Sequence, residues 1–147
     1  MVENLPDKRI VNFIKKHHVL TLASVSGKNP WCANCFYVYN SEENNLVFTS
    51  DDDTKHIQYA VKNPIVAGSV VLETTIIGKI QGIQFLGVLS KAEGQKLITA
   101  KQKYLLRFPI ATLMNTNLWI LDLTLIKMTD NRLGFGKKLI WKKDQMV

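Results

Sequence analysis

Hydrophobic and polar residues alternate with a period of two along most of this chain. Such alternation is typical of β-strands with one buried face, whereas apolar residues at positions i, i+3 and i+4 indicate one face of a helix. The segments with strand character cover residues 19–26, 31–40, 46–50, 65–73, 78–91, 117–129 and 133–141. The pattern therefore predicts a protein built mainly from strands.

Three shorter segments have helical spacing. The first follows the start signals Pro6 and Asp7 and ends near residue 17, the second is stopped by Pro64, and the third covers residues 93–108 before Pro109. Each helix has residues that we expect on one side: Ile10, Phe13 and Ile14 in the first helix, Ile57, Ala60 and Val61 in the second, and Leu97, Lys101, Tyr104, Leu105 and Phe108 in the third.

The turns indicate how the strands connect. Residues 27–30 form a turn between the first two strands and predict a hairpin. Gly82 and Gly87 predict bulges or bends of the kind that a closing barrel requires. Few strand pairs are joined by the long helical crossovers of a parallel sheet. We therefore expect a mainly β (α+β) fold, an antiparallel barrel with helices packed outside.

Length and composition favour one domain over residues 1–147. The chain has 147 residues, of which 46% are hydrophobic and 21% charged, and these are globular proportions. No window approaches the roughly 20 apolar residues of a membrane span, and the first residues lack the apolar stretch of a secretory signal. We expect a cytoplasmic protein without a membrane partner.

The formal charge of +7 favours anionic partners such as phosphorylated cofactors, nucleic acid or acidic surfaces. A solvated face is the simpler explanation for the two basic clusters, and we prefer it. They consist of Lys8, Arg9, Lys15 and Lys16, and of Arg132, Lys137, Lys138, Lys142 and Lys143. Nucleic-acid binding by an exposed strand requires aromatic residues interleaved with Lys or Arg. Residues 31–39 contain no Lys or Arg, so nucleic acid is not the expected partner.

Cys32 and Cys35 form a C-x-x-C pair, which can be a redox pair or half of a zinc site. Both lie in a predicted strand, where an offset of three residues places them on opposite faces. The chain has no second cysteine pair, and His17, His18 and His56 form no ligand motif. We therefore expect two free thiols and no metal site.

A phosphate-binding site is a stronger candidate, although the chain has no Gly-rich phosphate loop and no G-x-S-x-G nucleophile motif. A strand that ends in hydroxyl groups is followed by a helix whose first backbone N–H groups lie beside a lysine, which suits a phosphate. The candidate residues are Thr49, Ser50, Thr54, Lys55 and His56. An ordinary helix capped by Asp53 or Thr54 explains the same pattern, and the aspartates at 51–53 would repel a phosphate.

The order of these segments resembles the FMN-binding split barrels related to pyridoxamine phosphate oxidase, and the likeness extends over most of the chain. The ending DNRLGFGKKLIW is similar to that of a small bacterial branch of this superfamily. The resemblance implies a split barrel of about six to seven strands and a homodimer with FMN in the cleft between subunits. It also implies a flavin-dependent oxidoreductase that acts on a small molecule.

The resemblance also implies roles for particular residues. Lys55 would be the main phosphate partner within residues 49–56, and Gln81 would approach the flavin ring. Trp141 with Lys143 would close the site. The backbone beside the ring would be that of Trp31, Cys32, Ala33 and Asn34. The basic residues that the true oxidase carries on its second strand are absent from WCANCFYVYN, so oxidation of pyridoxamine phosphate is not implied.

Three alternatives remain open at this point. A deazaflavin would suit the same cleft. Haem would require one of the three histidines as an axial ligand. The barrel would also serve, without a cofactor, as a dimeric scaffold.

Overall fold

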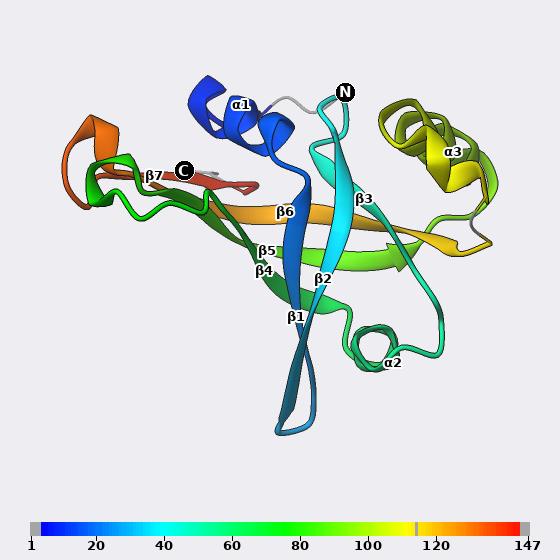
Figure 1. Cartoon of the computed structure of the whole chain (residues 1–147). Coiled ribbons are helices and arrows are strands. Elements are labelled where there is room, and N and C mark those ends of the chain that lie inside the picture. Colours follow the sequence, from blue (N-terminus) through cyan, green and yellow to red (C-terminus); the bar gives the residue numbers. More distant parts are fainter. Residues whose placement is uncertain (1–3, 114, 145–147) are drawn as a thin grey trace.

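Seven antiparallel strands form one sheet that closes on itself in the computed structural model, which describes residues 4–113 and 115–144 (Figure 1). The strands are β1 (Val19–Ser26), β2 (Asn29–Asn40), β3 (Asn45–Ser50), β4 (Ile65–Val71), β5 (Gln81–Lys91), β6 (Asn117–Asp130) and β7 (Lys138–Lys142). Their spatial order is β3-β2-β1-β4-β5-β6-β7, and an additional β3–β6 pairing closes a six-stranded barrel with β7 outside it. The predicted antiparallel barrel is confirmed.

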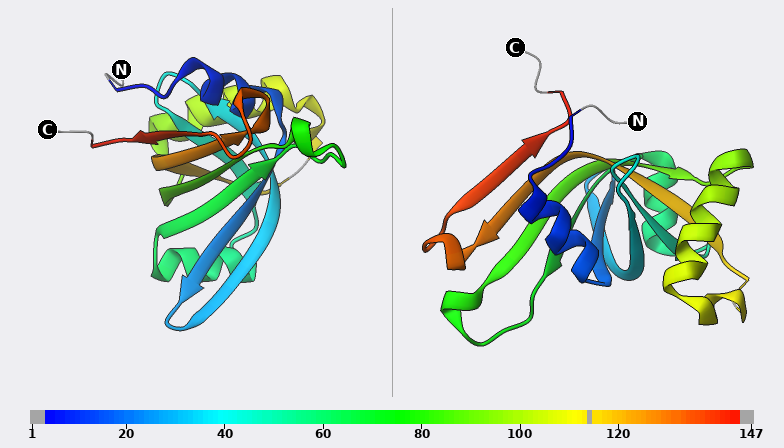
Figure 2. Two further views of the ribbon diagram at one scale, coloured as in Figure 1. Left: turned by 90° about the vertical axis from the view of Figure 1, so that its left-hand side faces the viewer. Right: turned by 90° about the horizontal axis from the view of Figure 1, so that it is seen from above.

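Three α-helices lie outside the strands, as two further views show (Figure 2). They are α1 (Lys8–Lys16), α2 (Lys55–Lys62) and α3 (Gly94–Arg107), and the short 3-10 helices are η1 (Ile77–Lys79), η2 (Pro109–Leu113) and η3 (Asn131–Leu133). The predicted order of one helix, three strands, one helix, two strands, one helix and two strands is confirmed. None of the helices in the described part of the chain is long and apolar enough to cross a membrane.

The first helix illustrates why the periodicity was informative. Asp7 caps α1 by accepting a hydrogen bond from the Arg9 backbone N–H, and the basic Lys15 and Lys16 stand in the last turn, where the helix dipole favours them. The predicted apolar residues of this helix, Ile10, Phe13 and Ile14, are buried. In α2 the buried residues include Ile57 and Ala60, but the prediction for Val61 is wrong because Val61 is 66% exposed.

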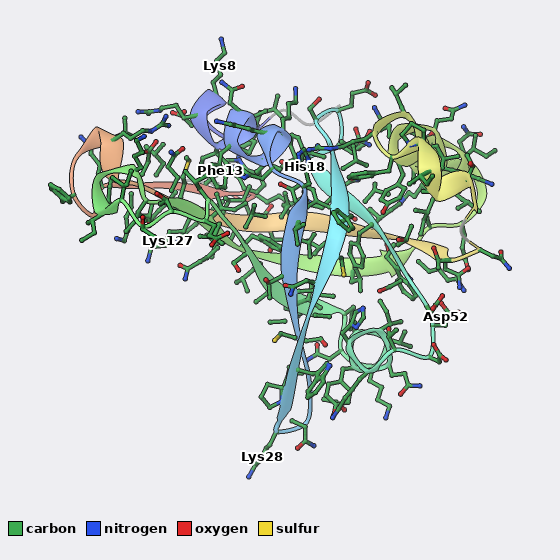
Figure 3. All side chains as sticks on the ribbon, in the orientation of Figure 1. Lys8, Phe13, His18, Lys28, Asp52 and Lys127 are labelled. Atoms are coloured by element: carbon green, nitrogen blue, oxygen red, sulfur yellow. The ribbon has the colours of Figure 1, made fainter. Side chains whose placement is uncertain are left out.

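The β1–β2 hairpin is longer than predicted. Asn29 and Pro30 belong to β2, so the turn consists of Gly27, with a positive φ of 60°, and Lys28. Figure 3 shows Lys28 at the tip of the hairpin, away from the barrel. Within the described residues, β2 pairs with β3 only from Tyr37 onward. Pro30 is tolerated because this half of β2 is an edge on one side.

Two predicted strands begin later than expected. Residues 78–80 belong to η1 or follow it, and β5 begins at Gln81. Residues 133–137 also lie outside a strand, because η3 and two glycines with positive φ, Gly134 and Gly136, precede β7. Alternation alone does not distinguish such turns from extended backbone.

Of the two predicted bulges, only the one at Gly87 is confirmed. The β5–β6 register shifts between Leu86 and Gly87, whereas Gly82 pairs regularly with both neighbouring strands. A Cβ atom at Gly87 would collide with the Leu121 side chain and lie 2.7 Å from the Asp122 carbonyl oxygen. The absence of a side chain lets β5 and β6 approach closely here.

Buried apolar residues form two separate clusters. The larger cluster fills the barrel and includes residues of α1 and α2 as well as inward side chains of the strands. The smaller one lies between α3 and the outer face of β3 and β6, and it consists of Val47, Ala92, Ala100, Tyr104, Ala111, Leu118 and Ile120. One part of the outer barrel surface is therefore covered by a helix.

Candidate functional site

Lys55, the main residue of the predicted phosphate site, lies at the start of α2 beside the hairpin (Figure 1). Its Nζ atom is 4.1 Å from the centre of the Trp31 ring and 5.7 Å from that of Tyr59. Trp31 and Lys55 are both exposed residues, so this cation–π contact leaves the ammonium accessible. Among the ion pairs of the described residues, none involves Lys55. The ammonium is thus available to an external anion.

The backbone at the start of α2 adds donors to this lysine. Thr54 is the N-cap residue but makes no side-chain capping bond, because its Oγ1 donates to the Asp51 carbonyl oxygen at 2.8 Å. The first-turn N–H groups consequently lack a capping side chain. Such groups favour an anion, through hydrogen bonds and through the helix dipole.

The acidic residues before α2 repel an anion less than their number suggests. Asp52 forms an ion pair with Lys91 at 2.8 Å and accepts a hydrogen bond from Asn117 Nδ2 at 2.7 Å. The hydrogen bond from Lys91 and that from Asn117 lower the pKa of Asp52. Figure 3 shows Asp52 on the loop that leads into α2. Its charge is therefore compensated within the chain.

His56 and Ser50 anchor α2 to the barrel. The Ser50 Oγ atom is 2.6 Å from His56 Nε2, and the Ser24 hydroxyl donates to the His56 carbonyl oxygen at 3.0 Å. Trp119 Nε1 donates to the Ser50 carbonyl oxygen at 3.1 Å. Burial lowers the pKa of His56, so the ring is neutral near physiological pH. These contacts make His56 a structural residue that faces inward.

Thr49 lies apart from the other predicted phosphate residues. Its Oγ1 atom is 3.4 Å from the Tyr104 hydroxyl oxygen of α3, whereas the next residue, Ser50, points to His56 on the inner side. Adjacent residues of a strand face opposite sides. The structure thus gathers Ser50, Thr54, Lys55 and His56 around α2 and directs Thr49 toward α3.

An uncovered groove of about 410 Å³ crosses the outer barrel surface over β1, β4, β5 and β6. Strand register places outward side chains in two parallel rows that continue onto β2. The first row is polar and consists of Asn34, Thr21, Ser69, Gln84 and Lys127. The second row is largely apolar and consists of Cys32, Ala23, Ala67, Leu86 and Leu125. Figure 3 labels Lys127 at one end of the polar row.

The predicted ring-binding segment of β2 forms the edge of this groove. Asn34 accepts a hydrogen bond from the Thr21 hydroxyl at 2.8 Å, and Cys32 is exposed. Trp31 and Ala33 alternate with them and face the other side. Because this half of β2 pairs only with β1 within the described residues, its second edge carries unpaired backbone groups. A planar ligand can therefore contact both side chains and backbone along residues 31–34.

The two cysteines lie on opposite faces of β2, as predicted, with Cys32 exposed and Cys35 buried. Burial raises the pKa of Cys35 to about 11, so its thiol stays protonated. In the described part of the chain, no three His, Cys, Asp or Glu side chains gather closely enough to hold a metal ion.

Gln81 and Trp141 are not brought to this region within one chain. Gln81 begins β5, pairs with Asp130, and its Nε2 donates to the Lys79 carbonyl oxygen at 3.4 Å. Trp141 is buried in the larger core, and its Nε1 donates to the Asn4 carbonyl oxygen at 3.2 Å. Gln84 is the glutamine of the groove. Sequence reasoning missed it, although the alternation of β5 places residue 84 on the same face as Leu86.

Solved structures share this architecture. A heme binding protein from Mycobacterium smegmatis matches with a TM-score of 0.72 and 18% identity, over 86% of this chain and 53% of that chain. An FAD-binding protein from Mesorhizobium loti matches with a TM-score of 0.70 and 12% identity, over 86% of this chain and 95% of that chain. At these identities the likeness establishes the fold alone, and it confirms the expected split barrel.

Sequence relatives identify the branch. No family model matches the chain. A UPF0306 protein of Photorhabdus laumondii is 42% identical over 134 residues, which cover 91% of this chain and 94% of that protein. A UPF0306 protein of Yersinia pestis is 41% identical over 143 residues, or 97% of each chain. These relatives confirm the expected bacterial branch, and the chain belongs to the UPF0306 family.

Proposed function

We propose that this protein binds FMN in the outer groove and acts as a flavin-dependent oxidoreductase. The observation that carries the proposal is the polar row beside the apolar row. A flavin ring system has a polar pyrimidine edge and an apolar dimethylbenzene edge, which these rows complement. When bound, the flavin would supply the electron and hydride chemistry, and the protein would position it and tune its electronic state.

The corner at Lys55 suits the terminal phosphate of FMN. It offers an ammonium without an ion-pair partner among the described residues, together with the first-turn N–H groups of α2. Trp31 of this corner and Cys32 of the groove are consecutive residues at the free edge of β2. A ligand that bends around this edge would reach both sites. At the far end of the groove, Lys127 would stabilise negative charge on reduced flavin.

Flavin is favoured over haem at this corner by the state of His56. A histidine that holds haem iron must offer a free imidazole nitrogen. The Nε2 atom of His56 is already engaged by Ser50, and the residue is buried. Solved structures of the same fold include an FAD-binding protein and a heme binding protein, so the choice of flavin rests on His56 and on the two rows of the groove.

We further propose that the protein is a homodimer whose second copy covers the groove. The face is open to solvent in a single chain, and it exposes apolar side chains at the paired residues Ile65 and Val88 and at Leu86. Lys127 is the only charged residue in the two rows. A second copy would bury these side chains and exclude water from the ring. A surface that exposes apolar side chains and carries little charge is typical of an interface.

The test is an absorption spectrum of the purified protein, recorded before and after incubation with FMN and removal of free ligand. We expect flavin bands with about one flavin per chain. Fluorescence titrations with FMN and riboflavin should then differ about tenfold in affinity, because only FMN carries the phosphate that Lys55 would bind. Haem bands, or equal affinities for the two flavins, would contradict the proposal.

A further inference from the structure

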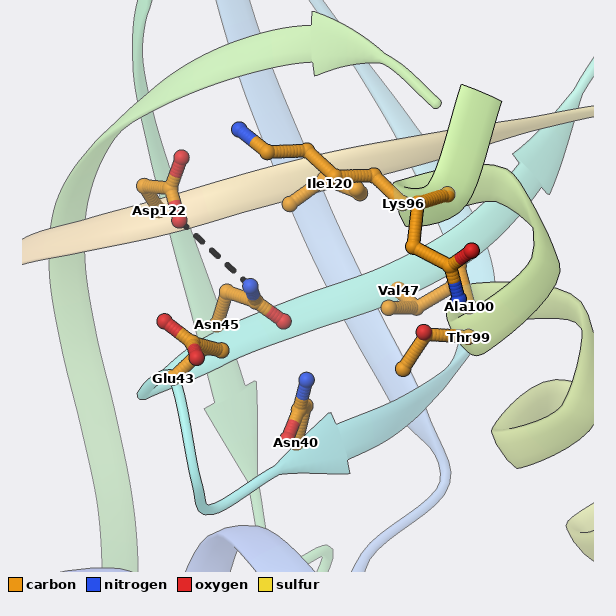
Figure 4. A pocket seen from close by; sticks show the side chains of 10 residues that line it. Asn40, Glu43, Asn45, Val47, Lys96, Thr99, Ala100, Ile120 and Asp122 are labelled. Atoms are coloured by element: carbon orange, nitrogen blue, oxygen red, sulfur yellow. Dashed lines mark hydrogen bonds between the residues drawn. The ribbon is translucent and has the colours of Figure 1, made fainter. Parts of the chain in front are cut away.

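A second cavity lies on the helix-covered side of the barrel, between α3 and the outer face of β2, β3 and β6 (Figure 4). Its volume is about 250 Å³. Val47 and Ile120 supply apolar walls, whereas Asn40, Asn45 and Asp122 supply polar groups. None of these residues belongs to the proposed flavin groove.

An unsatisfied acceptor distinguishes this cavity. Asn45 is only 6% exposed, and its Nδ2 donates to Asp122 Oδ1 at 3.4 Å. Its buried Oδ1 atom has no hydrogen-bond partner. A flipped amide would bring two oxygen atoms together at Asp122, so the hydrogen bond determines the orientation. A buried acceptor without a partner is unfavourable, because it has lost its hydrogen bonds to water, and this favours a bound donor here.

Asn40 offers a donor to the same space. Its Oδ1 accepts a hydrogen bond from the Glu42 backbone N–H at 3.2 Å, which leaves the Nδ2 group directed toward Asn45 (Figure 4). Among the hydrogen bonds of the described residues, none joins the two amides. A ligand between them would donate to Asn45 and accept from Asn40.

Charge selects among the ligands with this pattern. Glu43 and Asp122 contribute two carboxylates to the lining, and Lys96 contributes one ammonium. Neither carboxylate takes part in an ion pair of the described residues. The cavity thus has an excess of negative charge in a protein whose formal charge is +7. A cationic donor is favoured over a neutral or anionic one.

We propose that this cavity binds a small amino alcohol, a molecule with one ammonium group and a nearby hydroxyl. The ammonium donates to Asn45 Oδ1 and to Asp122, with Glu43 adding favourable charge. The hydroxyl accepts from Asn40 Nδ2, and the short carbon chain contacts Val47 and Ile120. The site is independent of the flavin proposal.

The test is a titration of the full chain with 2-aminoethanol, followed by amide chemical shifts in ¹H–¹⁵N NMR spectra near neutral pH and at low salt. We expect saturable shifts at Asn40, Asn45 and the first turns of α3, with a dissociation constant on the order of millimolar. Ethylene glycol and propionate are the neutral and anionic control probes, and neither should saturate. The absence of saturable shifts would mean that the cavity holds water only, and equal shifts with ethylene glycol would mean that the ammonium group is not recognised. Either result would overturn the proposal.

Two variants sharpen the test. Asp122→Asn preserves volume and an acceptor for Asn45 but removes a charge, and we expect about tenfold weaker binding of 2-aminoethanol. Glu73→Gln removes a charge from an exposed residue outside the cavity and should leave binding unchanged. An unfolded Asp122→Asn would be recognised by its amide spectrum, and Glu43→Gln would then test the charge requirement. Equal affinities in the charge variants and in Glu73→Gln would also contradict the proposal.

Discussion

The outer surface of the barrel is divided into two faces with different side chains. Beneath α3, the outward residues of β3 and β6 are large and buried, as Val47, Leu118 and Ile120 illustrate. Over β1, β4 and β5, the outward residues are small or half-exposed, as Thr21, Ala23 and Ala67 illustrate. The first face is completed by the chain itself, whereas the second has no covering element in the described residues.

The difference indicates which face is available for function. Large side chains fix α3 in one position, since Tyr104 packs in the smaller core and contacts Thr49. On the second face, the short side chains of β1 and β4 leave a shallow groove that a planar molecule or a second copy would fill. The two faces should therefore respond in opposite ways to substitutions.

The largest effect on stability is expected from a substitution in the core beneath α3. Tyr104→Ala should reduce the free energy of unfolding by on the order of 3 kcal/mol, because it removes a buried aromatic ring and leaves a cavity. Leu86→Ala on the uncovered face, where Leu86 is 40% exposed, should reduce it by less than about 1 kcal/mol in the monomer. Urea denaturation at low protein concentration measures both values. Equal losses would show that the two faces do not differ as described.

A charge on the uncovered face should affect association instead. Leu86→Glu should weaken the proposed dimer by about tenfold or more, because it would bury a carboxylate in an apolar interface. The matched control is Leu106→Glu, since Leu106 is 86% exposed on α3. Light scattering over a dilution series measures the dissociation constant. A dimer that tolerates Leu86→Glu as well as Leu106→Glu would exclude this face as the interface.

A smaller effect is expected at the corner beside the groove. Lys55→Ala should weaken FMN binding by about tenfold, because one charge-assisted contact with phosphate is lost. Riboflavin has no phosphate, so its affinity should not change. Lys62→Ala, at the other end of α2, is the matched control. Unchanged FMN affinity in Lys55→Ala would remove this residue from the phosphate role.

The fold was more predictable from the sequence than the site was. Alternation identified every strand, because one face of each strand packs into the larger core. It failed at η1 and η3, where short turns carry no distinctive pattern. Lys55 and Trp31 were identified, but their contact joins α2 to β2 and depends on tertiary packing. Gln84 was missed for a related reason, since only strand register shows that Asn34, Thr21, Ser69 and Gln84 lie in one row.

The smallest effect is expected on the pH dependence of stability, through His56, which anchors α2 to the barrel. Burial lowers the pKa of His56, so between this value and the ordinary value near 6.5 the unfolded chain binds more protons than the folded chain. The stabilisation is complete above about pH 6.5 and is lost as the pH falls through the folded pKa. His17, whose pKa is also lowered by burial, contributes in the same direction.

His56→Gln, which retains a hydrogen-bond partner for Ser50, should therefore lose less stability between about pH 7 and pH 5 than the original chain. Urea denaturation at several pH values in this range measures how steeply the free energy of unfolding falls with pH. The same pH dependence in His56→Gln and in the original chain would show that His56 does not have to stay neutral for α2 to remain anchored.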